Sequence, residues 1–168
     1  SLAYMIFENS FAHPTMMIRK FIFNEYTYSE ENDACEDFVL WRDILLGGYK
    51  ITNIKKILLK YRTHNAQISI SKSKLQNKNV AKESMKILNH FGIKSSEGCI
   101  LNLQRPVYAK NKYDENTDKL FEELIAIKQI NKNIFYKHLS LYCFYSNKKL
   151  SLYKGYFKFR NVYYYLLY

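Results

Sequence analysis

A chain of 168 residues, 48% of them hydrophobic, is long enough for one packed domain, and this composition excludes an intrinsically disordered segment. The formal net charge of +11 favours contact with polyanions, although a solvated, lysine-rich surface accounts for it equally well. Cys35, Cys99 and Cys143 are widely spaced and form no Cys-x-x-Cys pair, which predicts reduced cytoplasmic thiols rather than a disulfide framework or a zinc site. No apolar run reaches the roughly 18 residues of a transmembrane helix.

The start of the chain, residues 1–28, is predicted to be extended. Residues 4–7 and 15–18 are short apolar runs typical of strands, and Pro14 favours an extended His13 at the entrance of the second run.

A helix is predicted after the polar, acidic loop at residues 29–35. Asp33 and Glu36 form a capping-box-like start, and Gly47 followed by Gly48 supplies the end. The apolar stripe of this helix consists of Phe38, Trp41, Ile44 and Leu45.

Two strands are predicted next, at residues 50–54 and 56–62. Because side chains alternate along a strand, an extended chain through this region places Arg62 and His64 on the same face.

Helices are predicted in the second half of the chain, separated by irregular stretches. One helix follows the loop at residues 65–78 and ends at Gly92, and another begins at Asp114 or Thr117. The stretch between them, residues 93–113, is predicted to be irregular.

Four short motifs occur in order within the first 70 residues. They are His13-Pro14-Thr15 running to Arg19-Lys20, Glu36-Asp37-x-x-Leu40-Trp41, Gly48-Tyr49-Lys50-x-x-Asn53 and Tyr61-Arg62-x-His64. Each motif alone is weak, but their order and spacing resemble the C-terminal half of family 2 glycosyltransferases, which invert and have the GT-A fold. The resemblance implies an α/β fold: a partial GT-A mixed sheet in residues 1–70, the acceptor-side half of the catalytic domain, followed by a helical, basic and aromatic region in residues 71–168.

The resemblance also implies a catalytic carboxylate. An inverting transferase needs a base that takes the proton of the acceptor hydroxyl as this oxygen attacks the anomeric carbon. Asp37 matches the family's general base, with Glu36 beside it, and the first turn of a helix stabilises the ionised form of such a carboxylate. Taken alone, the two acids are more typical of an ordinary helix start, and Trp41 with the flanking motifs is what favours the catalytic interpretation.

Further roles follow only from the resemblance. Trp41 and His13 would line the acceptor site, Arg62 would approach the diphosphate and His64 would bind a divalent metal. Each has a structural alternative: a core tryptophan, a histidine bonded to backbone, an arginine capping a strand face and a strand-end histidine.

The chain departs from the family in lacking both an Asp-x-Asp motif and a Gly-rich phosphate loop. We therefore expect a piece of a longer protein, without the nucleotide-binding half and inactive alone. Mn²⁺ or Mg²⁺ would require the missing Asp-x-Asp half, and an exposed sheet edge would favour a homo-oligomer. The implied partners are a nucleotide-sugar donor and a glycan or lipid-linked acceptor, in cell-surface polysaccharide biosynthesis.

Residues 124–168 contain no acidic residue, and their lysines and arginines alternate with tyrosine and phenylalanine. This pattern is typical of a peripheral membrane face, here the inner face of the membrane, but also of a helical subdomain with a wet basic side. A non-catalytic module that docks to membrane or nucleic acid is the alternative function. Nucleic acid is the less favoured partner because no recognition module accompanies the pattern.

Overall fold

The computed structural model describes residues 2–62, 64, 67–109 and 114–146, and over these residues the chain forms α-helices and short 3-10 helices without any β-strand. The predicted α/β fold, a partial GT-A mixed sheet, is therefore wrong, and the described chain is all-α. The sheet edge on which the homo-oligomer prediction rested is likewise absent from these residues. None of the described helices combines the length and the apolar composition of a membrane-spanning segment.

The N-terminal apolar run is buried instead of forming a strand. A 3-10 helix, η1 (Leu2–Tyr4), continues into a turn in which the Phe7 N–H donates to the Tyr4 carbonyl at 3.0 Å. Met5, Ile6 and Phe7 are all fully buried. Three consecutive buried side chains do not suit a strand with one wet face, because successive strand side chains point to opposite faces.

The second expected strand is replaced by η2 (His13–Thr15). Pro14 occupies the start of this turn, and Thr15 donates to the Ala12 carbonyl through its backbone N–H at 2.9 Å and its hydroxyl at 2.7 Å. These local bonds satisfy groups that a strand would offer to a neighbour. Two further 3-10 helices follow, η3 (Lys20–Asn24) and η4 (Glu30–Asn32).

The first long helix, α1 (Glu36–Leu46), confirms the helix that the apolar stripe predicted. It ends at Gly47, and Gly48 follows with a φ of 86°, a conformation that favours glycine. The capping box is wrong, since Cys35 is the N-cap residue and makes no side-chain cap bond. Asp33 instead accepts a salt bridge from Lys72 at 2.9 Å.

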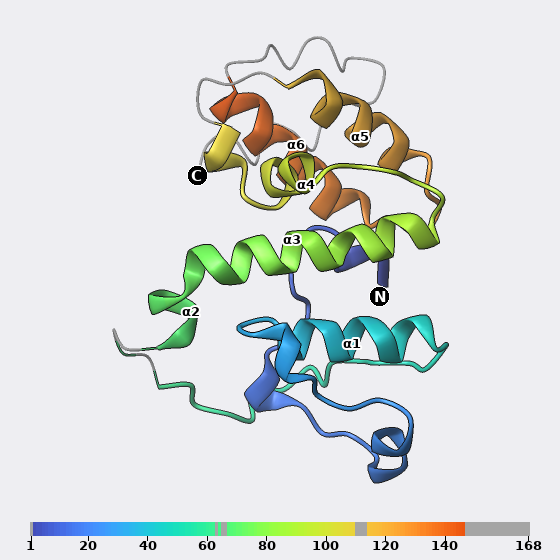
Figure 1. The fold of residues 1–168 in the computed structure, drawn as a ribbon, viewed down its shortest axis with the longest axis vertical. Coiled ribbons are helices and arrows are strands. Elements are labelled where there is room, and N and C mark those ends of the chain that lie inside the picture. Colours follow the sequence, from blue (N-terminus) through green and yellow to red (C-terminus); the bar gives the residue numbers. More distant parts are fainter. Residues whose placement is uncertain (1, 63, 65–66, 110–113, 147–168) are drawn as a thin grey trace.

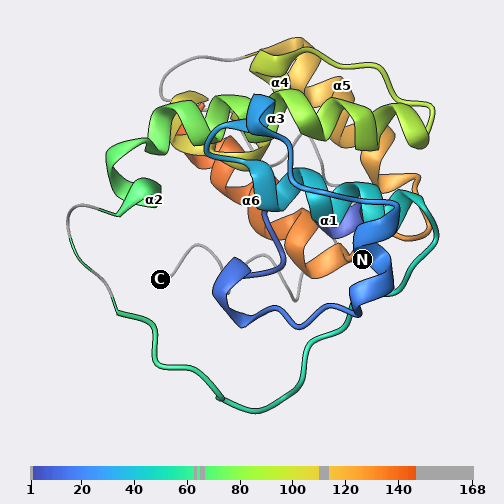
Figure 2. The ribbon, with the colours of Figure 1, turned by 60° about the horizontal axis from the view of Figure 1, so that its bottom comes forward.

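The segment at residues 50–62 has no regular structure, so the two strands predicted there are wrong. Figure 2 shows it as a wide arc that runs away from the helices between α1 and α2 (Ile68–Ser71). Ile57 is 97% exposed and Leu58 74% exposed. A strand requires a hydrogen-bonded neighbour, and no described segment supplies one here.

The remaining helices form a layered stack in which α3 lies between α1 on one side and a group of helices on the other (Figure 1). These elements are α3 (Ser73–His90), α4 (Glu97–Gln104), η5 (Pro106–Ala109), α5 (Glu115–Ile125) and α6 (Lys132–Tyr145).

The helix predicted to end at Gly92 and the helix predicted to begin at Asp114 or Thr117 are both confirmed, the latter with the Asp114 carboxylate accepting from the Asn116 N–H at 3.2 Å. The loop predicted at residues 65–78 is wrong over residues 68–71 and 73–78, which belong to α2 and to the start of α3. The prediction of an irregular stretch at residues 93–113 is wrong over α4. Ser96 caps this helix by accepting from the Cys99 N–H at 3.2 Å.

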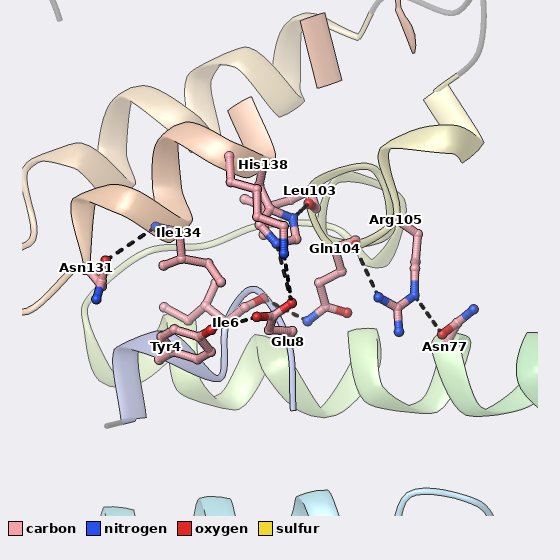
Figure 3. Close-up of polar contacts among 11 residues, drawn as sticks. Tyr4, Ile6, Glu8, Asn77, Leu103, Gln104, Arg105, Asn131, Ile134 and His138 are labelled. Atoms are coloured by element: carbon pink, nitrogen blue, oxygen red, sulfur yellow. Dashed lines mark hydrogen bonds and ion pairs between the residues drawn. The ribbon is translucent and has the colours of Figure 1, made fainter. Parts of the chain in front are cut away.

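A buried polar layer ties the N-terminal segment to the helices (Figure 3). The Gln104 side-chain amide donates to the Ile6 carbonyl at 2.7 Å and to the Ser84 hydroxyl at 2.9 Å. Nearby, Glu8 accepts from the Tyr4 hydroxyl at 2.6 Å. Because Ile6 is held in this way, the chain leaves the core at a fixed point and passes next to α1.

His138 of α6 belongs to the same layer (Figure 3). Its Nδ1 lies 2.7 Å from the Leu103 carbonyl, which can only accept, so Nδ1 carries the proton. Burial is the main influence on this ring and lowers the pKa of His138.

The core itself is one cluster with members from Ala3 to Tyr142. The division at residue 70 remains a prediction, and the tail at residues 147–168 lies outside the described residues.

Candidate functional site

Asp37 stands in the first turn of α1 and is half-buried. Its Oδ1 accepts from the Phe38 backbone N–H at 2.6 Å, and its Oδ2 accepts from the Asn9 side-chain amide at 3.1 Å. Each carboxylate oxygen therefore has one donor from a different segment of the chain. The carboxylate makes no salt bridge with any described residue.

Burial is the largest influence on Asp37 and raises the pKa of this carboxyl group. The Phe38 and Asn9 hydrogen bonds and the nearby His13 oppose the rise, whereas Glu36 adds to it. The net direction is upward. A general base works best when its pKa approaches the working pH, so this shift suits proton transfer.

Aromatic rings lead from the core to the surface beside this carboxylate. The Trp41 ring is fully buried, and the His13 ring meets it edge-on with centroids 6.1 Å apart. His13 Nε2 lies 2.8 Å from the Tyr28 hydroxyl, in hydrogen-bond contact. Tyr28 in turn contacts Phe23, with centroids 6.2 Å apart, and both of these rings are exposed.

Tyr28 is electrostatically coupled to the carboxylates of α1. Although the ring is exposed, partial desolvation of the phenol and then the negative charges of Asp37 and Glu36 raise the pKa of Tyr28. The structure thus brings together Glu36, Asp37 and Trp41 of the second motif and His13 of the first. Their catalytic and acceptor-binding roles remain predictions.

Two residues of this group, Asn9 and Tyr28, were missed by sequence reasoning. Asn9 lies shortly before the motif that begins at His13, and its position beside that motif was a signal that could have been used. Tyr28 is one of 16 tyrosines in the chain, so its type alone gave no signal.

Arg62 and His64 lie apart from this group, on the exposed segment between α1 and α2. Their described bonds are local: the Gln67 amide donates to the Arg62 carbonyl at 3.2 Å, and the His64 N–H donates to the Gln67 side-chain oxygen at 3.3 Å. No described interaction joins either residue to Asp37. The diphosphate role of Arg62 and the metal role of His64 remain predictions.

The described residues do not fit a divalent metal on their own. Within them, no three histidine, cysteine, aspartate or glutamate side chains are grouped closely enough to hold an ion. His64 is exposed, and no other histidine, cysteine, aspartate or glutamate lies within about ten residues of it in the sequence. We therefore derive no step through Mn²⁺ or Mg²⁺.

Comparison with known proteins places the chain near the glycosyltransferases. Over 73 residues, which are 44% of this chain, it is 32% identical to an uncharacterized glycosyltransferase of Methanocaldococcus jannaschii. The match spans 25% of that protein's length. No protein-family model matches the chain, and no solved structure matches it. The similarity supports a relationship to glycosyltransferases in general, and it assigns neither family 2 nor the GT-A fold.

Proposed function

We propose that this chain is the acceptor-side part of an inverting glycosyltransferase and that Asp37 is its general base. The observation that carries the proposal is the Asp37 carboxylate itself. It is half-buried, held at both oxygens, raised in pKa and next to the His13–Tyr28 pair. Similarity to a glycosyltransferase supplies the class of reaction.

The proposed step is a single displacement. An acceptor hydroxyl donates a hydrogen bond to Asp37, and its oxygen attacks the anomeric carbon of a nucleotide sugar. The new carbon–oxygen bond forms while the bond from the anomeric carbon to the diphosphate oxygen breaks. The proton passes to the Asp37 carboxylate, and the nucleoside diphosphate leaves with the bonding electrons. Attack from the opposite face inverts the anomeric configuration.

The surrounding rings are suited to holding a glycan or lipid-linked acceptor. Tyr28 presents an apolar ring face and a polar tip at the surface, a combination that matches a sugar ring with its hydroxyls. The hydrogen bond between His13 and Tyr28 fixes both rings relative to buried Trp41. This arrangement would orient the acceptor hydroxyl toward Asp37.

Sugar transfer by the full-length protein that contains this sequence tests the proposal. Nucleoside diphosphate release is followed with a panel of nucleotide sugars, with and without glycan and lipid-linked acceptors. The product configuration is read from the anomeric coupling constant in proton NMR. We expect acceptor-dependent release and a product with the anomeric configuration opposite to that of the donor.

Two results would count against this function. Retention of configuration would contradict a direct displacement with Asp37 as base. Failure of every donor to release diphosphate would favour a non-catalytic docking module instead.

A further inference from the structure

We infer that Asn9 is the positioning residue of this site: its side-chain amide holds the Asp37 carboxylate in one orientation while a backbone bond holds the amide. The catalytic meaning of this inference rests on the proposed function. The contact between Asn9 and Asp37 does not, because titration of the Asp37 carboxyl group measures it without any sugar transfer.

The orientation of the Asn9 amide follows from its partners. The Phe11 backbone N–H donates to Asn9 Oδ1 at 3.2 Å. Because a backbone N–H can only donate, the atom that faces it must be the amide oxygen. The amide nitrogen is then turned toward Asp37 Oδ2, at 3.1 Å. One side chain is thus fixed at its oxygen and donates from its nitrogen.

The carboxylate gains a defined direction from this arrangement. The Phe38 N–H contacts Oδ1 and the Asn9 amide contacts Oδ2, so rotation of the carboxylate breaks at least one bond. Each carboxylate oxygen has two acceptor sites, and one on each oxygen remains for an incoming hydroxyl. A base held within a narrow range of angles is what proton transfer to a positioned substrate requires.

The chain is held in place on both sides of Asn9, which positions Asn9 beside the Asp37 carboxylate. The Ile6 carbonyl before it is fixed by Gln104, and the Phe11 side chain after it is only 4% exposed. Asn9 itself is exposed. Water competes for an exposed hydrogen bond and limits its contribution to folding, whereas the effect on Asp37 is direct because the amide donates to the carboxylate.

The choice of an amide also suits a base. The charged and titratable groups that interact with Asp37 are Glu36 on its own helix, the Cys35 thiol at the N-cap, His13 on η2 and Tyr28 on the loop before η4. None of them is a lysine or an arginine. A permanent cation in the place of Asn9 would strongly favour the ionised carboxylate and make it a weaker base. A neutral amide also fixes the orientation of the Asp37 carboxylate, but it stabilises the ionised form less and so lowers the pKa less than a cation would.

Two variants separate the donor role of Asn9 from its role in the local turn. Asn9→Ala removes both hydrogen bonds of the side chain. Asn9→Asp keeps an oxygen that accepts from the Phe11 N–H but replaces the donor with a second carboxylate. Asn24→Ala is the matched control, since Asn24 is exposed at the end of η3 and has no described side-chain bond.

The measurement is the titration of the Asp37 carboxyl carbon by NMR in the chain described above. We expect Asn9→Ala to raise the pKa of Asp37 by about half a unit to one unit, because a bond to the charged form is lost. Asn9→Asp should raise it further through like-charge repulsion, with the two carboxylates titrating as a coupled pair. Asn24→Ala should leave it unchanged. An Asp37 titration that is the same in wild type and both Asn9 variants, with folding intact, would overturn the inference.

Kinetics of the full-length protein then test the catalytic meaning. A raised pKa means that Asp37 becomes ionised only at higher pH, so the acidic limb of the kcat/KM profile should move upward by the shift seen in NMR. A limb that stays in place while the NMR pKa moves would remove Asn9 from the mechanism. If the protein transfers no sugar at all, the proposed function fails, while the NMR result still decides whether Asn9 controls Asp37.

Discussion

Replacing Glu83 with alanine is expected to lower the free energy of unfolding by about 3 kcal/mol. Glu83 lies on α3 and is 6% exposed, and its carboxylate pairs with Arg42 of α1 and with Lys86 at 2.8 Å. Arg42 is 4% exposed. Removal of Glu83 leaves a buried guanidinium whose remaining described partner is Asp43, at 2.7 Å. The estimate stands at the lower end of the usual range for a broken buried pair because Asp43 remains.

Denaturant unfolding followed by Trp41 fluorescence measures this loss, since Trp41 is the sole tryptophan of the chain. The control is the double variant Arg42→Met with Glu83→Leu, which removes both charges and fills the space. It should lose clearly less stability than Glu83→Ala, because no buried charge is left unpaired. A loss below about 1 kcal/mol for Glu83→Ala would contradict a buried link between α1 and α3.

Replacing Trp41 with alanine is expected to cost about 3–5 kcal/mol, the usual range for deletion of a large buried aromatic side chain. Trp41 is fully buried between the core and His13. Its indole Nε1–H has no acceptor among the described residues. Trp41→Phe removes this unpaired donor as well as some volume, so its cost should be much smaller, about 1–2 kcal/mol.

Far-ultraviolet circular dichroism during denaturant unfolding measures both tryptophan variants, which have no indole to report. Equal losses for Trp41→Ala and Trp41→Phe would show that the indole nitrogen is satisfied and that the ring shape is the main requirement. A loss below about 1 kcal/mol for Trp41→Ala would contradict its place in the core.

The helices were the predictable part of this fold, because their signals are local. The stripe containing Phe38, Trp41 and Ile44, with glycines after it, describes one helix without reference to any other segment. In the same way, Gly92 indicated the end of one helix and Asp114 the start of another from the local sequence alone. The helix at Glu97–Gln104 was missed although Ser96 is a good cap, since its eight residues are too few for a clear apolar period.

The strands were predicted wrongly because a short apolar run does not specify its own conformation. Residues 4–7 are apolar whether they alternate in a strand or are buried together in a turn, and packing against α1 selects the turn. The run at residues 50–62 has several β-branched residues among its lysines, yet a strand also requires a neighbour, which no local pattern can guarantee.

The site was predictable in part. The Glu36-Asp37 pair, Trp41 and His13 were identified by motif, and the structure places them together. Asn9 and Tyr28 reach the site through contacts between distant positions: Asn9 lies 28 residues from Asp37, and Tyr28 lies 15 residues from His13. Contacts of this kind depend on how the 3-10 turns fold over α1, which composition and spacing do not encode.

The most direct test of the account is diphosphate release by the full-length protein with Asp37→Asn. Asparagine keeps the size of the side chain and an oxygen for the Phe38 N–H, but it cannot take a proton from an acceptor hydroxyl. Asp33→Asn is the control, since it removes an exposed carboxylate just before α1, whose charged partner among the described residues is Lys72. We predict at least a hundredfold loss of release for Asp37→Asn, about 2.7 kcal/mol of barrier, and near wild-type release for Asp33→Asn. Equal release by wild type and Asp37→Asn would show that Asp37 is only an acid at a helix start, and the central claim would be wrong.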